Sequence, residues 1–166
     1  MMSYIATTAT AAMTELLSGQ TGVHYRLAQR LVESDGPLSE LVSPLIRTGH
    51  LSVEMADKAQ GAAYPQLFVY CERIQNLLRE KFSPFSGTVH VAVEVRHSQD
   101  RLERLQERAQ LYTEAILDVL ESCRGEWRPG YCFGGRYEVK FEPVRHGGKN
   151  FVQIVRITVP LEVNIG

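Results

Sequence analysis

Strict alternation of hydrophobic and polar positions marks residues 89–96. The odd positions are all valine, and the even positions are His90, Ala92, Glu94 and Arg96. A period of two in β-branched residues predicts a strand with one face on a hydrophobic core. We expect the even-numbered face, including His90, to meet solvent or a partner subunit, so that no polar side chain points inward.

The period changes directly after this strand. Ser98 is a suitable N-cap, and Asp100 is an acid in the first turn, where the helix dipole favours one. Apolar residues then recur at three-and-four spacing: Leu102, Leu105, Ala109, Tyr112, Ile116, Val119 and Leu120. This spacing predicts a helix over residues 99–122 that packs its apolar stripe on the valine face.

Three further segments alternate in the same way as the valine strand: residues 66–72, 136–144 and 151–165. The Gly147-Gly148 pair between the last two suits a tight hairpin turn, because glycine adopts positive φ without strain. Together with residues 88–96, these segments predict an α+β fold. Its sheet has about four strands, mixed or antiparallel, and the 99–122 helix lies across one face.

Patterns are weaker in the first third of the chain. Residues 3–18, rich in Ala and Thr, predict a weak helix that ends near Gly19 and could dock on a neighbour rather than on its own core. A second helix follows at Val23, and residues 51–55 suit a short strand. We expect a single domain over residues 1–166, with a helical portion at 1–63 and an α+β core at 64–166.

Two segments between the main elements have patterns of their own. Ile74, Leu77, Leu78 and Phe82 have helical spacing and predict a short helical segment before the turn at 83–87. Residues 124–135 are rich in glycine and aromatic side chains, which predicts a long surface loop or flap.

Composition places the chain among soluble globular proteins. It has 166 residues, of which 44% are hydrophobic and 22% charged, with a net charge of −1. Because no basic field is present, we expect neither sequence-specific nucleic acid nor a membrane as a partner. Cys71, Cys123 and Cys132 lack metal-type spacing, so we interpret them as reduced thiols of a protein made in the cytoplasm.

No catalytic pattern emerges from the polar residues. The five histidines are scattered without metal-ligand spacing, and the acids of the 99–122 helix alternate with arginines as on a solvated face. We therefore predict no catalytic, metal or cofactor-binding residue. An alternative is a small enzyme with its site under the 124–135 segment.

The last strand is unusually long. Residues 151–165 would span about 50 Å when extended, more than we expect a domain of this size to pair internally. Pro160 cannot donate to a ladder, so we expect a bend, bulge or edge there. An exposed apolar edge favours pairing with a neighbouring subunit. The expected interface residues are Arg145, His146, Lys149, Val155, Ile157, Val163 and Ile165.

Residues 64–166 resemble the tail-terminator, or head–tail joining, proteins of tailed bacteriophages. The likeness rests on the runs YPQLFVY at 64–70 and FSGTVHV at 85–91, then on the helix and the Gly-Gly hairpin. The resemblance implies a small α+β virion protein without catalytic residues or a cofactor, located in the tail or neck after assembly in the host cytoplasm. It also implies a six-fold ring that caps the tail tube and docks to the head connector. A head-completion or connector adaptor protein is an alternative.

Overall fold

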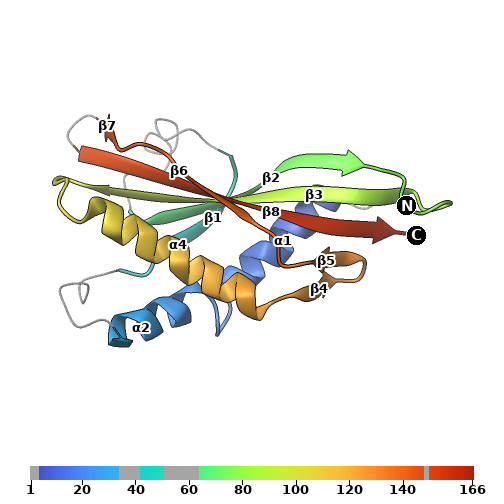
Figure 1. Ribbon diagram of the computed structural model, residues 1–166, viewed down its shortest axis with the longest axis horizontal. Helices are drawn as coiled ribbons and strands as arrows, with labels where there is room; N and C mark the ends of the chain where they lie inside the picture. Colours follow the sequence, from blue (N-terminus) through green and yellow to red (C-terminus); the bar gives the residue numbers. More distant parts are fainter. Residues whose placement is uncertain (1–3, 34–41, 51–63, 148–149) are drawn as a thin grey trace.

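The computed structural model describes residues 4–33, 42–50, 64–147 and 150–166. Within these ranges the chain forms three helices and eight strands (Figure 1). In chain order they are α1 (Ile5–Ser18), α2 (Val23–Glu33), β1 (Leu45–Thr48), β2 (Gln66–Asn76), β3 (Phe85–Gln99), α4 (Leu105–Ser122), β4 (Gly125–Arg128), β5 (Tyr131–Phe133), β6 (Glu138–Phe141), β7 (Arg145–Gly147) and β8 (Asn150–Ile165). None of the helices in these ranges is long and apolar enough to cross a membrane.

One mixed sheet contains all of these strands. Along its main path the order is β1-β2-β3-β8-β5-β4, and β6 and β7 also pair with β8. β1 runs parallel to β2, whereas the other pairs are antiparallel. The sheet curls into a half-barrel. Its two longest strands, β3 and β8, run along the length of the molecule in Figure 1.

The predicted fold, about four strands with one long helix across them, is wrong. The sheet has eight strands, and the long helix shares its face of the sheet with two N-terminal helices. β1, β4, β5 and β7 are only three or four residues long, too short to show a period of two. They become strands because they find backbone partners: β1 pairs with β2, β5 and β7 pair with β8, and β4 pairs with β5.

The valine face of β3 forms the centre of the core. Val89, Val91, Val93 and Val95 are all fully buried and belong to one hydrophobic cluster with residues of the three helices. The helical members of this cluster are Ala9, Met13, Leu17, Val23, Leu27, Ala109, Tyr112, Ala115, Ile116, Val119 and Leu120. The expectation that the first helix docks on a neighbour is therefore wrong, since α1 packs on the chain's own sheet.

β8 has no unpaired overhang along β3. The two strands pair over their full lengths, from Phe85 opposite Ile165 to Gln99 opposite Phe151, without a register shift. The expectation that residues 151–165 are too long for internal pairing is therefore wrong, because β3 is itself 15 residues long. On its other side, β8 pairs with β6 over residues 155–158 and with β5 at residues 162 and 163.

Pro160 lies between these two pairings, where β8 has no further strand partner among the described strands on the side away from β3. A residue without a backbone N–H fits such a gap in the ladder.

α4 begins six residues later than predicted. Ser98 and Gln99 still pair with β8, so the backbone remains extended where the sequence suggested a helix N-cap. The Gln99 side chain donates hydrogen bonds to the carbonyl oxygens of Arg101 and Glu103, at 2.7 and 2.6 Å. Leu102 therefore lies outside the helix. Sheet pairing here prevails over a local capping preference.

The 124–135 segment contains a hairpin rather than a loop or flap. β4 and β5 pair with each other, and β5 joins β8. Gly130, at φ +84°, forms the turn, and its carbonyl oxygen accepts a hydrogen bond from the Asn164 N–H at 2.9 Å. A Cβ at Gly130 would lie 2.4 Å from the Asn164 carbonyl oxygen, so this close approach requires glycine.

Two other predicted strands differ from the structure or lie outside it. The 136–144 strand is shorter than predicted, since β6 spans only Glu138–Phe141. The strand predicted at 51–55 lies outside the described residues.

Candidate functional site

The face of the sheet opposite the valines carries a buried ionic cluster. Glu94 and Arg96 are only 3% and 2% exposed, so the expectation that the even-numbered face of β3 meets solvent is wrong for these residues. Tyr70 Oη donates a hydrogen bond to Glu94 Oε2 at 2.5 Å, and Arg96 Nη2 lies 3.3 Å from Glu94 Oε1. The Arg96 guanidinium lies over the Phe68 ring, 4.2 Å from its centroid. These contacts join β2 to β3 through charge and aromatic packing.

A second cation extends this cluster to β8. Arg156 Nη2 lies 3.6 Å from Glu94 Oε2, so Glu94 has an arginine near each carboxylate oxygen. Burial, followed by the hydrogen bond to Glu94, raises the pKa of Tyr70. Burial alone would lower the pKa of Arg156, but Tyr70 and Glu94 raise it. The phenol thus stays protonated and Arg156 stays charged near neutral pH, which suits a structural role.

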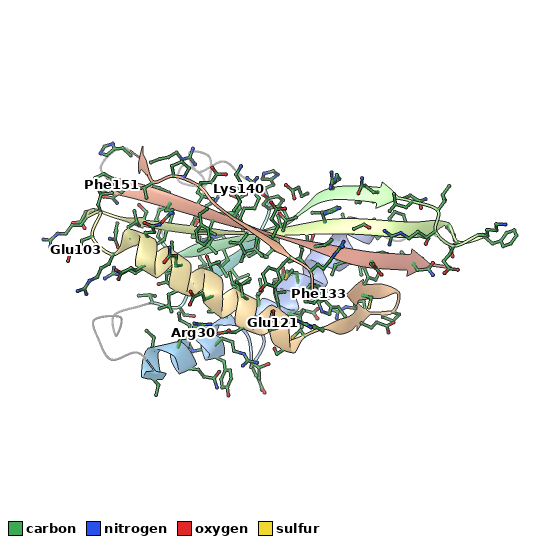
Figure 2. The ribbon with its side chains drawn as sticks, viewed as in Figure 1. Arg30, Glu103, Glu121, Phe133, Lys140 and Phe151 are labelled. Atoms are coloured by element: carbon green, nitrogen blue, oxygen red, sulfur yellow. The ribbon has the colours of Figure 1, made fainter. Side chains whose placement is uncertain are left out.

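A charged pocket lies beside this cluster, with a volume of about 390 Å³. Side chains from β2, β3, β6 and β8 line it; Lys140, labelled in Figure 2, is among them. The lining residues are Glu72, Arg73, His90, Glu138, Lys140, Arg156 and Thr158. Cationic and anionic groups are interspersed there, so the pocket is a candidate surface for recognising a polar partner.

Contacts within the charged pocket pair its groups with one another. Arg73 Nη2 donates to His90 Nε2 at 3.2 Å, and Thr158 Oγ1 donates to Glu72 Oε2 at 3.4 Å. Burial, and then the neighbouring Arg73 charge, lower the pKa of His90. His90 is therefore neutral near pH 7, and its Nε2 can accept a hydrogen bond from Arg73. Nowhere in the described ranges do three His, Cys, Asp or Glu side chains gather as metal ligands would.

The predicted interface residues are distributed over different environments. Val155, Ile157 and Val163 are buried in the chain's own core, and Ile165 is half-buried at the end of β8. Arg145 and His146 are exposed in β7, and the His146 ring packs edge-on against Phe151 at 5.4 Å. Lys149 lies outside the described residues. Val155, Ile157 and Val163 thus contact other residues of their own chain.

A second hollow lies next to the β4–β5 hairpin, where the alternative enzyme site was expected. Its volume is about 410 Å³, and its lining includes Arg79, Glu126, Cys132 and Glu162. Arg79 Nη1 lies 3.7 Å from Glu162 Oε1. The aromatic side chains of this hairpin point elsewhere: Trp127 packs on Phe133 at 5.3 Å between centroids. The enzyme alternative stays a prediction.

A projecting turn between β2 and β3 exposes large apolar side chains. In this turn, residues 77–84 and hereafter the hairpin tip, Leu77 and Leu78 are about half or more exposed and Phe82 is fully exposed. The hairpin extends beyond the rest of the sheet in Figure 1. The predicted short helix at 74–82 is wrong, since Ile74 belongs to β2 and the other three residues belong to the turn.

Side-chain hydrogen bonds hold the hairpin tip in one shape. Asn76 Oδ1 accepts from the backbone N–H groups of Leu78 and Ser86, at 3.3 and 3.1 Å, and Asn76 Nδ2 donates to the Pro84 carbonyl at 3.2 Å. Ser86 Oγ accepts from the N–H of Glu80 at 3.2 Å. Asn76, Pro84 and Ser86 flank the apolar run, and because such residues favour turns, they are the signal that could have predicted this turn.

The chain matches no protein-family model, and a search of curated proteins found no match. The fold and the site describe a protein with one mixed half-barrel sheet, helices on one face, an ionic cluster on the other, and a projecting apolar turn.

Proposed function

We propose that this protein is a structural component of virion assembly, a ring-forming tail terminator that caps a bacteriophage tail tube and joins the tail to the head. The observation that carries the proposal is the hairpin tip, which presents Leu77, Leu78 and Phe82 to solvent on a braced projection. Apolar side chains gathered on a projecting surface mark a protein–protein contact.

The polar face of the sheet supports an assembly role as well. The charged pocket contains Arg73, Lys140 and Arg156 together with Glu72 and Glu138, a pattern suited to the polar part of an interface. Such mixed charges select a partner and its orientation more than they add affinity.

The particular identity rests on the resemblance of residues 64–166 to tail-terminator proteins. In this proposal the partners are further copies of the chain in a six-fold ring, the tail tube protein and the head–tail connector proteins. The chain acts by binding rather than by catalysis, needs no cofactor, and engages neither a membrane nor a specific nucleic acid sequence. Its location is the neck of the virion, after assembly in the host cytoplasm.

Deleting the gene from the phage or prophage that encodes it tests this proposal. We expect electron micrographs to show overlong tails and separate heads, and we expect the full-length chain supplied in trans to restore joined virions. Mass spectrometry of purified virions should then detect the chain. Tails of normal length that fail to join heads would favour the connector adaptor alternative. Normal virions in the deletion strain would refute a role in assembly.

A further inference from the structure

The hairpin tip holds its apolar side chains in a strained conformation. Leu78 and Phe82 adopt φ of +49° and +69°, in the left-handed region that side chains other than glycine rarely occupy. Phe82 is fully exposed, so burial within the chain does not compensate for this strain. Strain of this kind persists where the surrounding structure imposes it, and it gathers at sites of function. The tip is therefore shaped for a contact outside its own chain.

An apolar pocket lies at the edge of the sheet beside the beginning of α1. Its volume is about 400 Å³, and residues of α1, the end of β1 and the middle of β2 line it. Its lining includes Ala6, Thr7, Ala11, Gly49, Val69 and Cys71. A cavity of about 150 Å³ accommodates a benzene molecule. This α1 pocket therefore has room for the side chains of both Phe82 and Leu78.

A hairpin tip cannot reach the α1 pocket of its own chain. Cys71 lines the pocket, and Leu77 begins the tip six residues further along the chain, just after β2 ends, which is about 20 Å away at the usual rise of a strand. The pairing of Asn76 with Gly87 keeps the hairpin extended. A Cβ at Gly87 would lie 1.9 Å from the Gln75 carbonyl oxygen, which reflects how closely the two strands approach there.

We propose that the hairpin tip of one copy inserts Phe82 and Leu78 into the α1 pocket of a second copy. The proposal deepens the ring-forming function proposed above and rests on it. Tip and pocket are different surfaces of one chain, so the contact is head-to-tail, and repetition with a closing rotation produces a ring. The pocket also lies where β1 ends: β1 pairs with β2 as far as Val69, and no other described strand pairs with β2 on that side. Within the described ranges, the incoming turn thus meets both an apolar hollow and a strand edge.

Two variants separate the halves of this contact. Phe82→Ser removes the apolar insert, and Ala11→Arg places a long charged side chain at the mouth of the pocket. Both positions are exposed, so we expect circular dichroism and melting temperature to stay close to those of the unaltered chain. The matched control is Val32→Ser, since Val32 is an exposed apolar residue of α2 outside both surfaces. Light scattering should show self-association weakened roughly tenfold or more by either variant and unchanged by the control.

Mixing the two variants tests the head-to-tail geometry. The Ala11→Arg chain keeps an intact tip and the Phe82→Ser chain keeps an intact pocket, so the mixture should form one-to-one dimers that grow no further. In the otherwise unaltered chain, a benzoylphenylalanine at position 82 should cross-link to peptides of α1 or β2 from a second copy. General destabilisation would produce neither result.

Several outcomes would overturn the inference. They are a Phe82→Ser chain that associates as the unaltered chain does, cross-links that map only to a tail tube protein, and a chain that remains monomeric both free and on tails. If Phe82→Ser still forms rings that cap tails, the inference fails and the proposed function stands. If cross-linking and dimer formation succeed but the chain is absent from virions, the inference stands and the proposed function fails.

Discussion

Arg30 of α2 donates two parallel hydrogen bonds to the carboxylate of Asp118 in α4. The distances are 2.6 Å from Nε to Oδ2 and 2.9 Å from Nη2 to Oδ1, and Nη1 also lies 2.7 Å from Glu114 Oε2. The sequence suggested a solvated row of acids on this helix, including Glu114. Two of the acids of α4 instead hold α2 in place across more than eighty residues of chain.

Replacing Arg30 by Lys should reduce the free energy of unfolding by about 1 kcal/mol, because lysine cannot form the two-point contact. The loss should shrink in high salt, which screens partly exposed charges. Urea denaturation at low and high salt measures both effects. The control is Arg124→Ala, which removes the exposed contact of Arg124 with Glu121 and should change stability less. Equal losses of unfolding free energy from the two variants would contradict a special role for the two-point contact of Arg30 with Asp118.

Glu94→Ala should destabilise the protein by about 3–5 kcal/mol, because it leaves Arg96 buried without its carboxylate partner on β3. Tyr70→Phe removes one hydrogen bond but leaves both arginines near Glu94, so its cost should be only about 1 kcal/mol. Chemical denaturation of both variants checks the order. A Glu94→Ala protein as stable as Tyr70→Phe would show that the ionic cluster contributes little.

Two leucines that the sequence placed on one helical stripe should respond differently to Asp. Leu105 is fully buried and Leu102 is 58% exposed, so Leu105→Asp should cost several kcal/mol, about 3 or more, and Leu102→Asp less than 1. Val91→Asp should resemble Leu105→Asp, since Val91 is equally buried. Melting temperatures provide the comparison. A similar loss of stability at Leu102 and Leu105 would show that α4 begins before Leu105.

Stability should decrease in alkaline solution because of Tyr112. Burial raises the pKa of Tyr112 to about 12, from 10.0 in the unfolded chain. The unfolded state therefore releases this proton first, and stability falls as the pH rises from about 10 toward 12, by up to roughly 2–3 kcal/mol. Tyr112→Phe should remove this part of the pH dependence. At neutral pH the same substitution should cost about 1 kcal/mol, since Tyr112 Oη donates to the Val42 carbonyl at 2.9 Å.

Denaturation series at pH 8 and pH 11 measure both effects of the Tyr112→Phe substitution. If the decrease between the two pH values were the same with and without Tyr112, ionisation of this phenol would not be its cause.

The alternating pattern of β3 could not predict that some of its polar residues are buried. Glu94 and Arg96 alternate with valines as residues of a solvated face do, and only their neighbours Tyr70, Phe68 and Arg156 make them a buried cluster. Those neighbours come from two other strands, so the contacts depend on sheet order and register. The same applies to the α1 pocket, which three separate elements line.

The sequence by itself determined the elements whose signal is local and long. The valine strand and the apolar stripe from Leu105 to Leu120 are visible because each repeats over several periods of its own structure. Tertiary structure alone decided the short strands, the late start of α4 and the full pairing of β8 with β3. It also decided that Leu77, Leu78 and Phe82 form an exposed turn rather than a helix. The physical reason is that each of these features depends on backbone partners distant in the sequence, which local periodicity does not encode.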